Sequence, residues 1–189
     1  MKHCLNLKQR RKMRTGITGT PGTGKTEVCN VLKSKYHYKI IDLNAVIKEK
    51  KFYTGRDLKR DTLIVDIPRL KKYFAELKGE YIVEGHLAHH LDLDLVIILR
   101  TKPKMLRKRL EAKNWNKEKI RENVEAEALD VILIETLQRH KLENIHEIDT
   151  TNKTPNEVAN CIVEIIEGKK TYPPGKIDYS QELFNHAKY

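Results

Sequence analysis

The segment GTPGTGKT, residues 19–26, restricts the fold more than any other part of the chain, because its glycines and lysine have the spacing of a known loop motif. It matches the pattern GxxxxGK followed by Ser or Thr at every fixed position. Glycines let a backbone turn so that successive N–H groups point inward, where they can hold phosphate oxygens. Such a loop needs a strand before it and a helix after it, and the segments MRTGIT (13–18) and KTEVCNVLKSKY (25–36) have those patterns. The sequence therefore predicts a phosphate-binding loop between a strand and the positive end of a helix.

The rest of the chain alternates between short apolar runs and helical patterns. We expect further strands at residues 38–43, 80–85, 93–101 and 145–150. Helices are expected at residues 44–51, 66–79, 102–114, 116–140 and 154–168, and a polar, basic loop at residues 52–62. Apolar strands separated by helices are typical of a parallel sheet that is covered on both faces. The predicted fold class is α/β: a P-loop NTPase three-layer sandwich with a five-stranded parallel sheet.

The chain has 189 residues, which suits one compact domain with its own core. Residues 1–12 are polar and basic and are interpreted as a flexible arm, whereas residues 13–168 contain all the predicted strands and helices. Residues 169–189 are a C-terminal tail with prolines and tyrosines, whose packing we cannot predict. Thr154 and Glu157 have the spacing of a capping box, which fixes the start of the last helix.

The net charge is +11, from 37 Lys and Arg against 26 Asp and Glu, and it predicts attraction to polyanions such as nucleotides or RNA. A lysine-rich solvated surface would explain the same charge. No apolar run approaches the ~20 residues that span a bilayer, and the basic N-terminal residues lack the apolar stretch of a secretory signal. The three scattered cysteines form no CxxC pair and fit a reducing compartment. We therefore expect a cytoplasmic protein without a membrane partner, or a nuclear one in a eukaryote.

The phosphate loop also predicts the cofactors ATP and Mg²⁺. Lys25 can reach the β- and γ-phosphates, and the hydroxyl of Thr26 can ligate Mg²⁺. The segment TTNKTP, residues 150–155, resembles the base-reading motif NKxD of GTPases, but Pro155 occupies the position of the aspartate. Without that aspartate, no pair of carboxylate oxygens is available to accept hydrogen bonds from guanine, so we exclude a GTP switch. A loop at this position can still line a purine.

A second group of candidate residues lies at the end of the segment YIVEGH, residues 81–86. Glu84 ends an apolar strand at the edge where parallel sheets bind ligands, and it can hold the Mg²⁺ shell or orient a water molecule. His86 points the same way if the strand is still extended there. The alternative for Glu84 is a helix cap or a loop carboxylate. His86, His89 and His90 also have the spacing of a helical metal site, which we do not favour because no acidic or cysteine partner accompanies them.

A basic run after the fourth strand includes Arg109, Lys113 and, beyond a break at Asn114 and Trp115, Arg121. Arginines bind phosphate in a bidentate manner, and phosphoryl-transfer enzymes use them to neutralise the migrating group. Most of the run must be a solvated basic face. We expect one or two catalytic members, Arg109 or Arg121.

In this order, the segments GTPGTGKT, VEGH, LRTKPKMLRKRLEAKNW, KEKIRENVEAE and IDTTNKTPNEV resemble the small adenylate kinase family of archaea and eukaryotic nuclei. The resemblance extends over about residues 13–168. It implies a monophosphate-binding segment at about residues 42–65 and a short lid at about residues 112–122. The ATP phosphate-binding positions that it implies are Gly22, Gly24, Lys25, Thr26 and Glu27.

The resemblance also assigns roles outside the phosphate loop. It implies that Lys113 takes the place of an ATP-contacting arginine and that Lys153 approaches the adenine. Glu84 and His86 match an Asp-x-His motif tied to the phosphoryl chemistry of the family. This chain departs from the family pattern, because Glu84 replaces the aspartate and Glu27 stands where relatives often have a second hydroxyl residue. The segment EGHLAHH also lacks the arginine that ordinary adenylate kinases carry there.

The function implied by the resemblance is that of a broad nucleoside monophosphate kinase (ATP + AMP = 2 ADP) with an ATPase side activity. A role in late maturation of the small ribosomal subunit and its rRNA 3′ end is implied as well. The implied partners are ATP, AMP or another monophosphate and, transiently, a small-subunit ribosomal protein and pre-rRNA.

Two other functions stay open at the sequence level. One is an ATP-hydrolysing assembly switch with little kinase activity, which the short lid and the missing arginine favour. The other is a small-metabolite kinase of the shikimate or gluconate type, because a sugar-acid carboxylate could use the same cations as a monophosphate. Those cations in residues 42–65 are Lys48, Lys50, Lys51, Arg56, Lys59 and Arg60.

Overall fold

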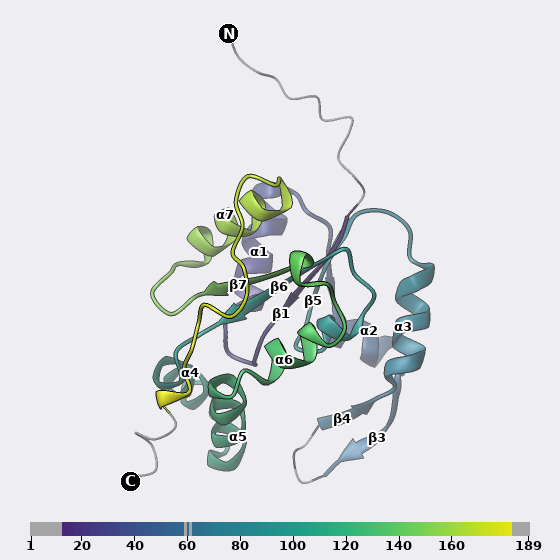
Figure 1. The fold of residues 1–189 in the computed structure, drawn as a ribbon. Helices are drawn as coiled ribbons and strands as arrows, with labels where there is room; N and C mark the ends of the chain where they lie inside the picture. The colour runs from purple at the N-terminus through teal and green to yellow at the C-terminus, as the bar shows by residue number, and fades with distance from the viewer. Residues whose placement is uncertain (1–12, 59, 61, 183–189) are drawn as a thin grey trace.

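A five-stranded parallel sheet forms the centre of the molecule in the computed structural model, which describes residues 13–58, 60 and 62–182 (Figure 1). Its strands are β1 (Arg14–Thr18), β2 (Ile40–Asp42), β5 (Tyr81–Glu84), β6 (Leu95–Arg100) and β7 (Ile145–Asp149). Their order across the sheet is β2-β5-β1-β6-β7, and all neighbouring strands run parallel. The predicted five-stranded parallel sheet is confirmed. The basic arm predicted at residues 1–12 lies outside the described residues.

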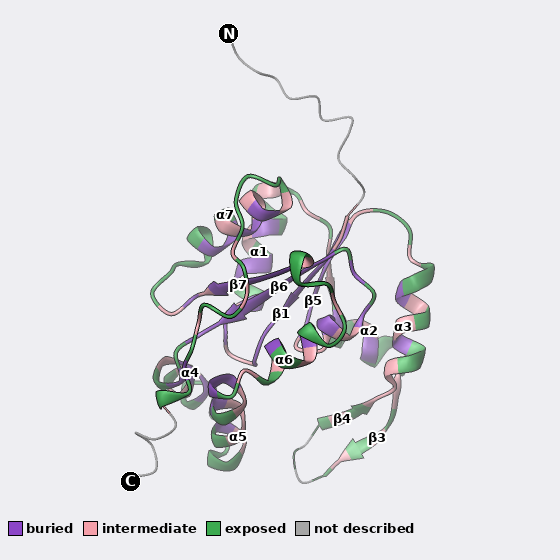
Figure 2. Ribbon diagram, in the orientation of Figure 1, coloured by how far each residue is buried: buried purple, intermediate pink, exposed green. Residues whose placement is uncertain are grey.

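Helices cover both faces of this sheet. One face carries α1 (Lys25–Tyr36) and α7 (Pro155–Ile166), and the other carries α2 (Leu43–Glu49), α3 (Ile67–Glu76) and α6 (Val131–Leu137). Successive side chains of a strand point to opposite faces. In β6, Ile97 therefore belongs to the core under α1 and α7, whereas Val96 and Ile98 belong to the core on the opposite face. The predicted three-layer α/β sandwich is confirmed, and Figure 2 shows strands β1, β5, β6 and β7 as mostly buried.

Two helices follow β6 and lie beyond the end of that strand. They are α4 (Pro103–Glu111) and α5 (Lys117–Ala128), and they share a small core of their own that includes Leu106 and Ile120. The predicted break between them is confirmed: Asn114 has a left-handed φ of 56°, and the Asn116 side chain accepts a hydrogen bond from the Lys119 N–H to start α5. Asparagine tolerates both conformations better than most residues.

Two local predictions were wrong. The loop expected at residues 52–62 contains an antiparallel hairpin of β3 (Tyr53–Asp57) and β4 (Thr62–Val65). Residues along β3 alternate between half-buried and exposed, as in a strand, but the residues of TGRD are polar or small and have low strand propensity apart from threonine. The helix expected at residues 116–140 is divided into α5 and α6, because Asp130 takes a left-handed φ of 56°.

The described part of the C-terminal tail lies along β7. The Glu147 N–H donates to the Tyr172 carbonyl at 2.9 Å, and Tyr179 is buried. At the start of α7 the Thr154–Glu157 capping box is present as predicted. Two 3-10 helices, η2 (Ala88–His90) and η3 (Leu142–Asn144), complete the secondary structure of the described residues. Among the residues that the structure describes, no helix has the length and apolar character that a membrane crossing requires.

Candidate active site

The phosphate loop has the backbone that its glycines make available. Gly24 has a φ of 94° and stands directly before α1, and a Cβ atom added there would meet nothing within 4 Å. The open space lies beside the first N–H groups of α1, which are free to bind an anion at a helix N-terminus. Gly19, with a φ of 138°, has no such room, because an added Cβ would lie 2.3 Å from the Leu99 carbonyl oxygen. One glycine therefore permits close packing against β6, and the other leaves room for a ligand.

Lys25 points its amino group at the backbone of the loop. Its Nζ donates to the carbonyl oxygens of Gly19 at 2.8 Å and Thr20 at 3.1 Å. Burial lowers the pKa of Lys25 to about 8, because the charged form loses hydration, although Glu84 and Glu127 oppose that effect. The amino group therefore remains mostly protonated at neutral pH, and a bound phosphate would favour the charged form further.

Thr26 and Glu84, the residues predicted to hold the metal, lie side by side. The Thr26 hydroxyl donates to Glu84 Oε1 at 2.8 Å, and Glu84 is only 8% exposed at the end of β5. Hydroxyl and carboxylate oxygens are hard ligands that suit Mg²⁺, which usually takes one or two protein oxygens and completes its shell with water and phosphates. The residues present therefore fit Mg²⁺. The alternative of a helix-capping role for Glu84 finds no support in this geometry.

His86 lies just beyond Glu84 and, like Glu84, lines the cavity described below. Burial lowers its pKa to about 4, and the nearby Lys25 adds to the effect. The imidazole is consequently neutral at physiological pH. It can exchange hydrogen bonds with a substrate, but it cannot supply positive charge to a transition state.

A cavity of about 1000 Å³ brings the predicted site residues together. All ten line it: Gly22, Gly24, Lys25, Thr26, Glu27, Glu84, His86, Arg109, Lys113 and Lys153. One end lies between the loop after β7 and the turn between α4 and α5, where Trp115 lines it. The other end reaches Asn44 of α2 and Thr62 of the hairpin. The volume is at the upper end of the range for small-molecule sites.

Arg109, the predicted catalytic arginine, lines the cavity and is also bonded to neighbouring backbone. Its guanidinium donates to the carbonyl oxygens of Gly22 and Thr150, each at 3.3 Å, and to the Thr101 hydroxyl. These contacts join the phosphate loop to the ends of β6 and β7. The alternative candidate, Arg121, is 66% exposed, pairs with Glu125 and is not among the residues that line the cavity. The structure does not support the prediction that Arg121 reaches the site.

The basic residues expected to hold a monophosphate are mostly elsewhere. Of the described cations in residues 42–65, Arg60 lines the cavity, whereas Lys48, Lys50, Lys51 and Arg56 do not, and Lys59 lies outside the described residues. Arg60 makes a bidentate ion pair with Glu122, with Nε–Oε2 and Nη2–Oε1 distances of 3.2 and 3.0 Å. This pair joins the hairpin region to α5, and both of its residues line the cavity.

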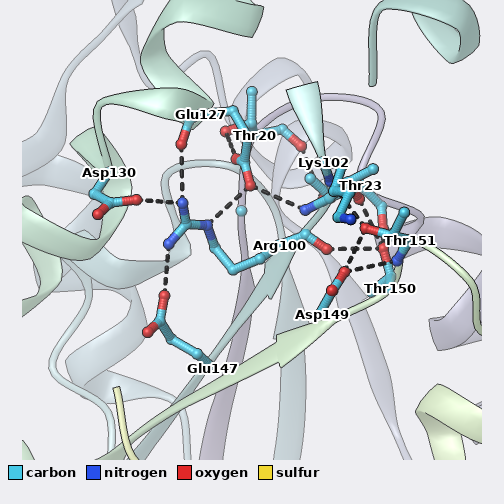
Figure 3. Close-up of polar contacts among 12 residues, drawn as sticks. Thr20, Thr23, Arg100, Lys102, Glu127, Asp130, Glu147, Asp149, Thr150 and Thr151 are labelled. Carbon is cyan, nitrogen blue, oxygen red and sulfur yellow. Dashed lines mark hydrogen bonds and ion pairs between the residues drawn. The ribbon is translucent and has the colours of Figure 1, made fainter. Parts of the chain in front are cut away.

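Sequence reasoning missed a buried network around Arg100, the last residue of β6 (Figure 3). Arg100 is 2% exposed and donates to Glu127 Oε1 at 2.9 Å and Glu147 Oε1 at 2.6 Å, and it also pairs with Asp130. Burial alone would lower the pKa of Arg100, but the carboxylates outweigh it and raise the pKa. The guanidinium is therefore permanently charged inside the protein.

Glu127 connects this network to the phosphate loop. Its Oε2 accepts a hydrogen bond from the Thr20 hydroxyl, while its Oε1 also accepts from the Thr101 N–H at 3.0 Å. The contact between Thr20 and Glu127 spans 107 residues of sequence. The sequence showed an arginine at the end of an apolar strand, but no local pattern indicated its carboxylate partners, which lie far away in the sequence.

A strand, a GxxxxGKT loop, a helix and a carboxylate at the end of the neighbouring strand define the class of P-loop nucleotide-binding proteins. The sequence profile of a family described as "AAA domain" matches residues 16–130. Solved structures of shikimate kinases share the fold. The enzyme from Acinetobacter baumannii, in complex with shikimate, has a TM-score of 0.61 at 15% identity and covers 85% of this chain and 96% of its own. The enzyme from Bacteroides thetaiotaomicron has a TM-score of 0.55 at 16% identity and covers 82% and 98%.

More similar sequences come from archaea and carry the name "Putative adenylate kinase". The protein of Methanothermobacter thermautotrophicus is 42% identical over 165 residues, which cover 87% of this chain and 95% of the relative. The protein of Methanosarcina barkeri is 44% identical over 180 residues, which cover 88% and 97%. The protein of Methanocaldococcus jannaschii is 36% identical over 177 residues, which cover 92% and 97%. The chain belongs to the protein family of these archaeal relatives.

Proposed function

We propose that this protein is a nucleoside monophosphate kinase that moves the γ-phosphoryl group of ATP to AMP or another monophosphate. The observation that carries the proposal is the single cavity that runs from the loop after β7, past the phosphate loop, to the β3–β4 hairpin. An ATPase without an acceptor substrate needs only the part of the cavity that holds ATP, between the loop after β7 and the phosphate loop. The name of the archaeal relatives agrees with this reaction.

The residues of the cavity divide into a donor half and an acceptor half. In the donor half, Lys153 and Lys113 face the space next to the phosphate loop, where we place the adenosine of ATP. In the acceptor half, Asn44, Arg60 and Thr62 face the space beside Glu84, where we place the monophosphate. Residues 42–65 are accordingly the proposed acceptor segment, and residues 112–122, with Trp115 and Lys119 on the cavity, the proposed lid.

The transfer itself requires little covalent chemistry from the protein. An oxygen of the acceptor phosphate forms a bond to the γ-phosphorus, the bond from that phosphorus to the β–γ bridging oxygen breaks, and ADP leaves. Lys25 and the N–H groups at the start of α1 neutralise the negative charge on the transferred group. Closure of the lid over the cavity excludes water, which would otherwise accept the phosphoryl group.

Thr26 and Glu84 would hold Mg²⁺, which supplies charge neutralisation on the phosphates when bound. Glu84 orients Thr26 through their hydrogen bond, and its carboxylate is buried on the cavity. His86, neutral beside them, can hydrogen-bond an acceptor oxygen.

A side reaction with water fits the same site. The segment EGHLAHH carries no arginine, and Arg60 is engaged by Glu122, so few free cations face the acceptor half among the residues that the structure describes. We propose that ATP hydrolysis competes with transfer when no monophosphate is bound. A function in maturation of the small ribosomal subunit, in the cytoplasm or nucleus, remains a proposal supported by the family resemblance and the net charge of +11. RNA binding of that kind should weaken steeply as salt rises.

An acceptor panel tests the proposed reaction. ATP and the protein are incubated with AMP, with other nucleoside monophosphates, with shikimate or with gluconate, and the phosphorylated products are separated. We expect transfer to the monophosphates alone. Transfer to a sugar acid or to shikimate, with none to any monophosphate, would assign the protein to the metabolite kinases.

A further inference from the structure

Two histidines of η2 and a glutamate of α6 come together at the edge of the cavity. The ligand atoms of His89, His90 and Glu135 all lie within 4.8 Å of one another. The sequence analysis assigned no acidic partner to these histidines. The fold supplies one, because Glu135 lies 46 residues after His89 in the chain and next to it in space.

The distances within this cluster are close to those of a metal site. His89 Nε2 lies 2.8 Å from Glu135 Oε2, and His90 Nε2 lies 3.6 Å from the same oxygen. Zinc binds nitrogen and oxygen at about 2.0–2.2 Å in a tetrahedron, which separates two ligand atoms by roughly 3.4 Å. The His90–Glu135 distance is already near that value, and a shift of the carboxylate by about half an ångström would bring the His89–Glu135 distance to it.

A second layer of contacts fixes the direction of the His89 ring. His89 is buried, and its Nδ1 lies 3.1 Å from the Thr18 hydroxyl, whereas its Nε2 points toward Glu135. The ring of His140 donates to the His89 carbonyl at 2.8 Å, which holds the backbone of η2. When Nδ1 carries the proton and donates to Thr18, the lone pair of Nε2 is free for a metal. Ligating histidines usually have an outer partner of this kind.

We propose that His89 Nε2, His90 Nε2 and Glu135 Oε2 bind a divalent transition-metal ion of the zinc class. Two imidazoles and one carboxylate are typical ligands of zinc, whereas Mg²⁺ prefers oxygen alone. The ligand set is separate from Thr26 and Glu84. His89 and Glu135 line the cavity, so the fourth coordination position faces the cavity and takes water or a donor atom of a bound molecule.

Binding at this position would tie η2 to α6. These two elements follow different strands and otherwise meet through side-chain packing, in which Ala88 and Leu133 belong to one core. An ion held by both should stabilise the native protein, since anything that binds the folded state alone raises its stability.

A titration with Co²⁺ tests the proposal. The untagged full-length protein is treated with a chelator, and Co²⁺ is added while its visible absorption is followed. The variants His90→Ala and Glu135→Gln are compared with the wild type. His37→Asn is the matched control, because His37 is exposed at the end of α1 with a left-handed φ of 57° that asparagine tolerates.

We expect the wild type and the control to bind Co²⁺ with the intense absorption of a four-coordinate site. The two variants should bind at least about 100-fold more weakly, because loss of even an outer partner typically costs 10- to 100-fold. Zn²⁺ should displace the Co²⁺, and an excess of Mg²⁺ should not. Equal affinity in all four proteins, or no four-coordinate spectrum in the wild type, would overturn the proposal.

A thermal measurement keeps the test independent of the absorption signal and of enzymatic activity. Zn²⁺ should raise the Tm of the wild type and of His37→Asn, and leave the Tm of a folded His90→Ala protein unchanged. An equal rise in His90→Ala would place the ion elsewhere. Neither readout depends on phosphoryl transfer, so a failure here would leave the kinase proposal standing.

Discussion

Lys25 is the residue on which phosphoryl transfer depends most directly. Its amino group lies beside the phosphate loop and is bound to two carbonyl oxygens that a phosphate can replace. Lys25→Met should reduce kcat at least about 1000-fold, the upper end of the cost of removing one charge-stabilising donor. Lys33→Met, on the exposed side of the same helix, is the control and should retain wild-type activity. Near-normal transfer by Lys25→Met would contradict the proposed role of Lys25 in phosphoryl transfer.

The same residue sets a pH limit. Since burial lowers the pKa of Lys25 to about 8, the free enzyme loses this positive charge as pH rises through that value. We expect kcat/KM for ATP, which reports ionisations of the free enzyme, to fall above about pH 8. Bound phosphate favours the charged lysine, so kcat should fall only at higher pH. The two profiles are measured with Mg²⁺ and acceptor saturating, and a flat kcat/KM up to pH 10 would contradict this account of Lys25.

At the scale of the elements, the β3–β4 hairpin is the structure that the proposed acceptor site depends on. Arg60 is its one described cation on the cavity, so Arg60→Ala should raise KM for the monophosphate about 10- to 100-fold through loss of a charged hydrogen bond. KM for ATP should change little. Arg56→Ala, on the same hairpin but off the cavity, is the matched control. Equal effects of the two substitutions on KM for the monophosphate would show that the acceptor does not contact Arg60.

The elements also show where sequence patterns suffice. Apolar strands such as LVIILR and the strand–loop–helix around Lys25 were predictable because one local pattern determines each. The hairpin was missed because its strands are half exposed and contain glycine, arginine and aspartate. The division between α5 and α6 was missed because the left-handed Asp130 pairs with a buried partner, Arg100, which lies 30 residues earlier in the chain.

At the scale of the whole molecule, Arg100 joins β6, β7 and the α5–α6 junction in one buried network. Arg100→Met should lower the free energy of unfolding by about 3–5 kcal/mol, since carboxylates such as Glu127 and Glu147 would be left buried without their cation. The matched control is Arg14→Met. The Arg14–Asp94 pair has side chains that are 31% and 44% exposed, and its loss should cost about 1 kcal/mol or less. Urea denaturation measures both, and equal costs would contradict a structural role for the network.

Much of the candidate site could be predicted from the sequence, because ten residues in four separate segments were expected near one site and all line one cavity. What could not be predicted was how these residues are held. Glu127 reaches Thr20 across 107 residues, and Glu135 reaches His89 across 46. Such contacts depend on how α5 and α6 dock on the sheet, and no motif encodes that docking.

The stoichiometry of ATP consumption tests the central claim most directly. ADP and inorganic phosphate are quantified after incubation of the protein with ATP and Mg²⁺, with and without AMP, and Lys25→Met serves as the blank. A kinase produces two molecules of ADP per ATP consumed when AMP is present, with a large stimulation of ADP formation and little phosphate release. That is the result we predict. One ADP and one phosphate per ATP, at a rate that AMP leaves unchanged, would contradict the claim and identify an ATPase.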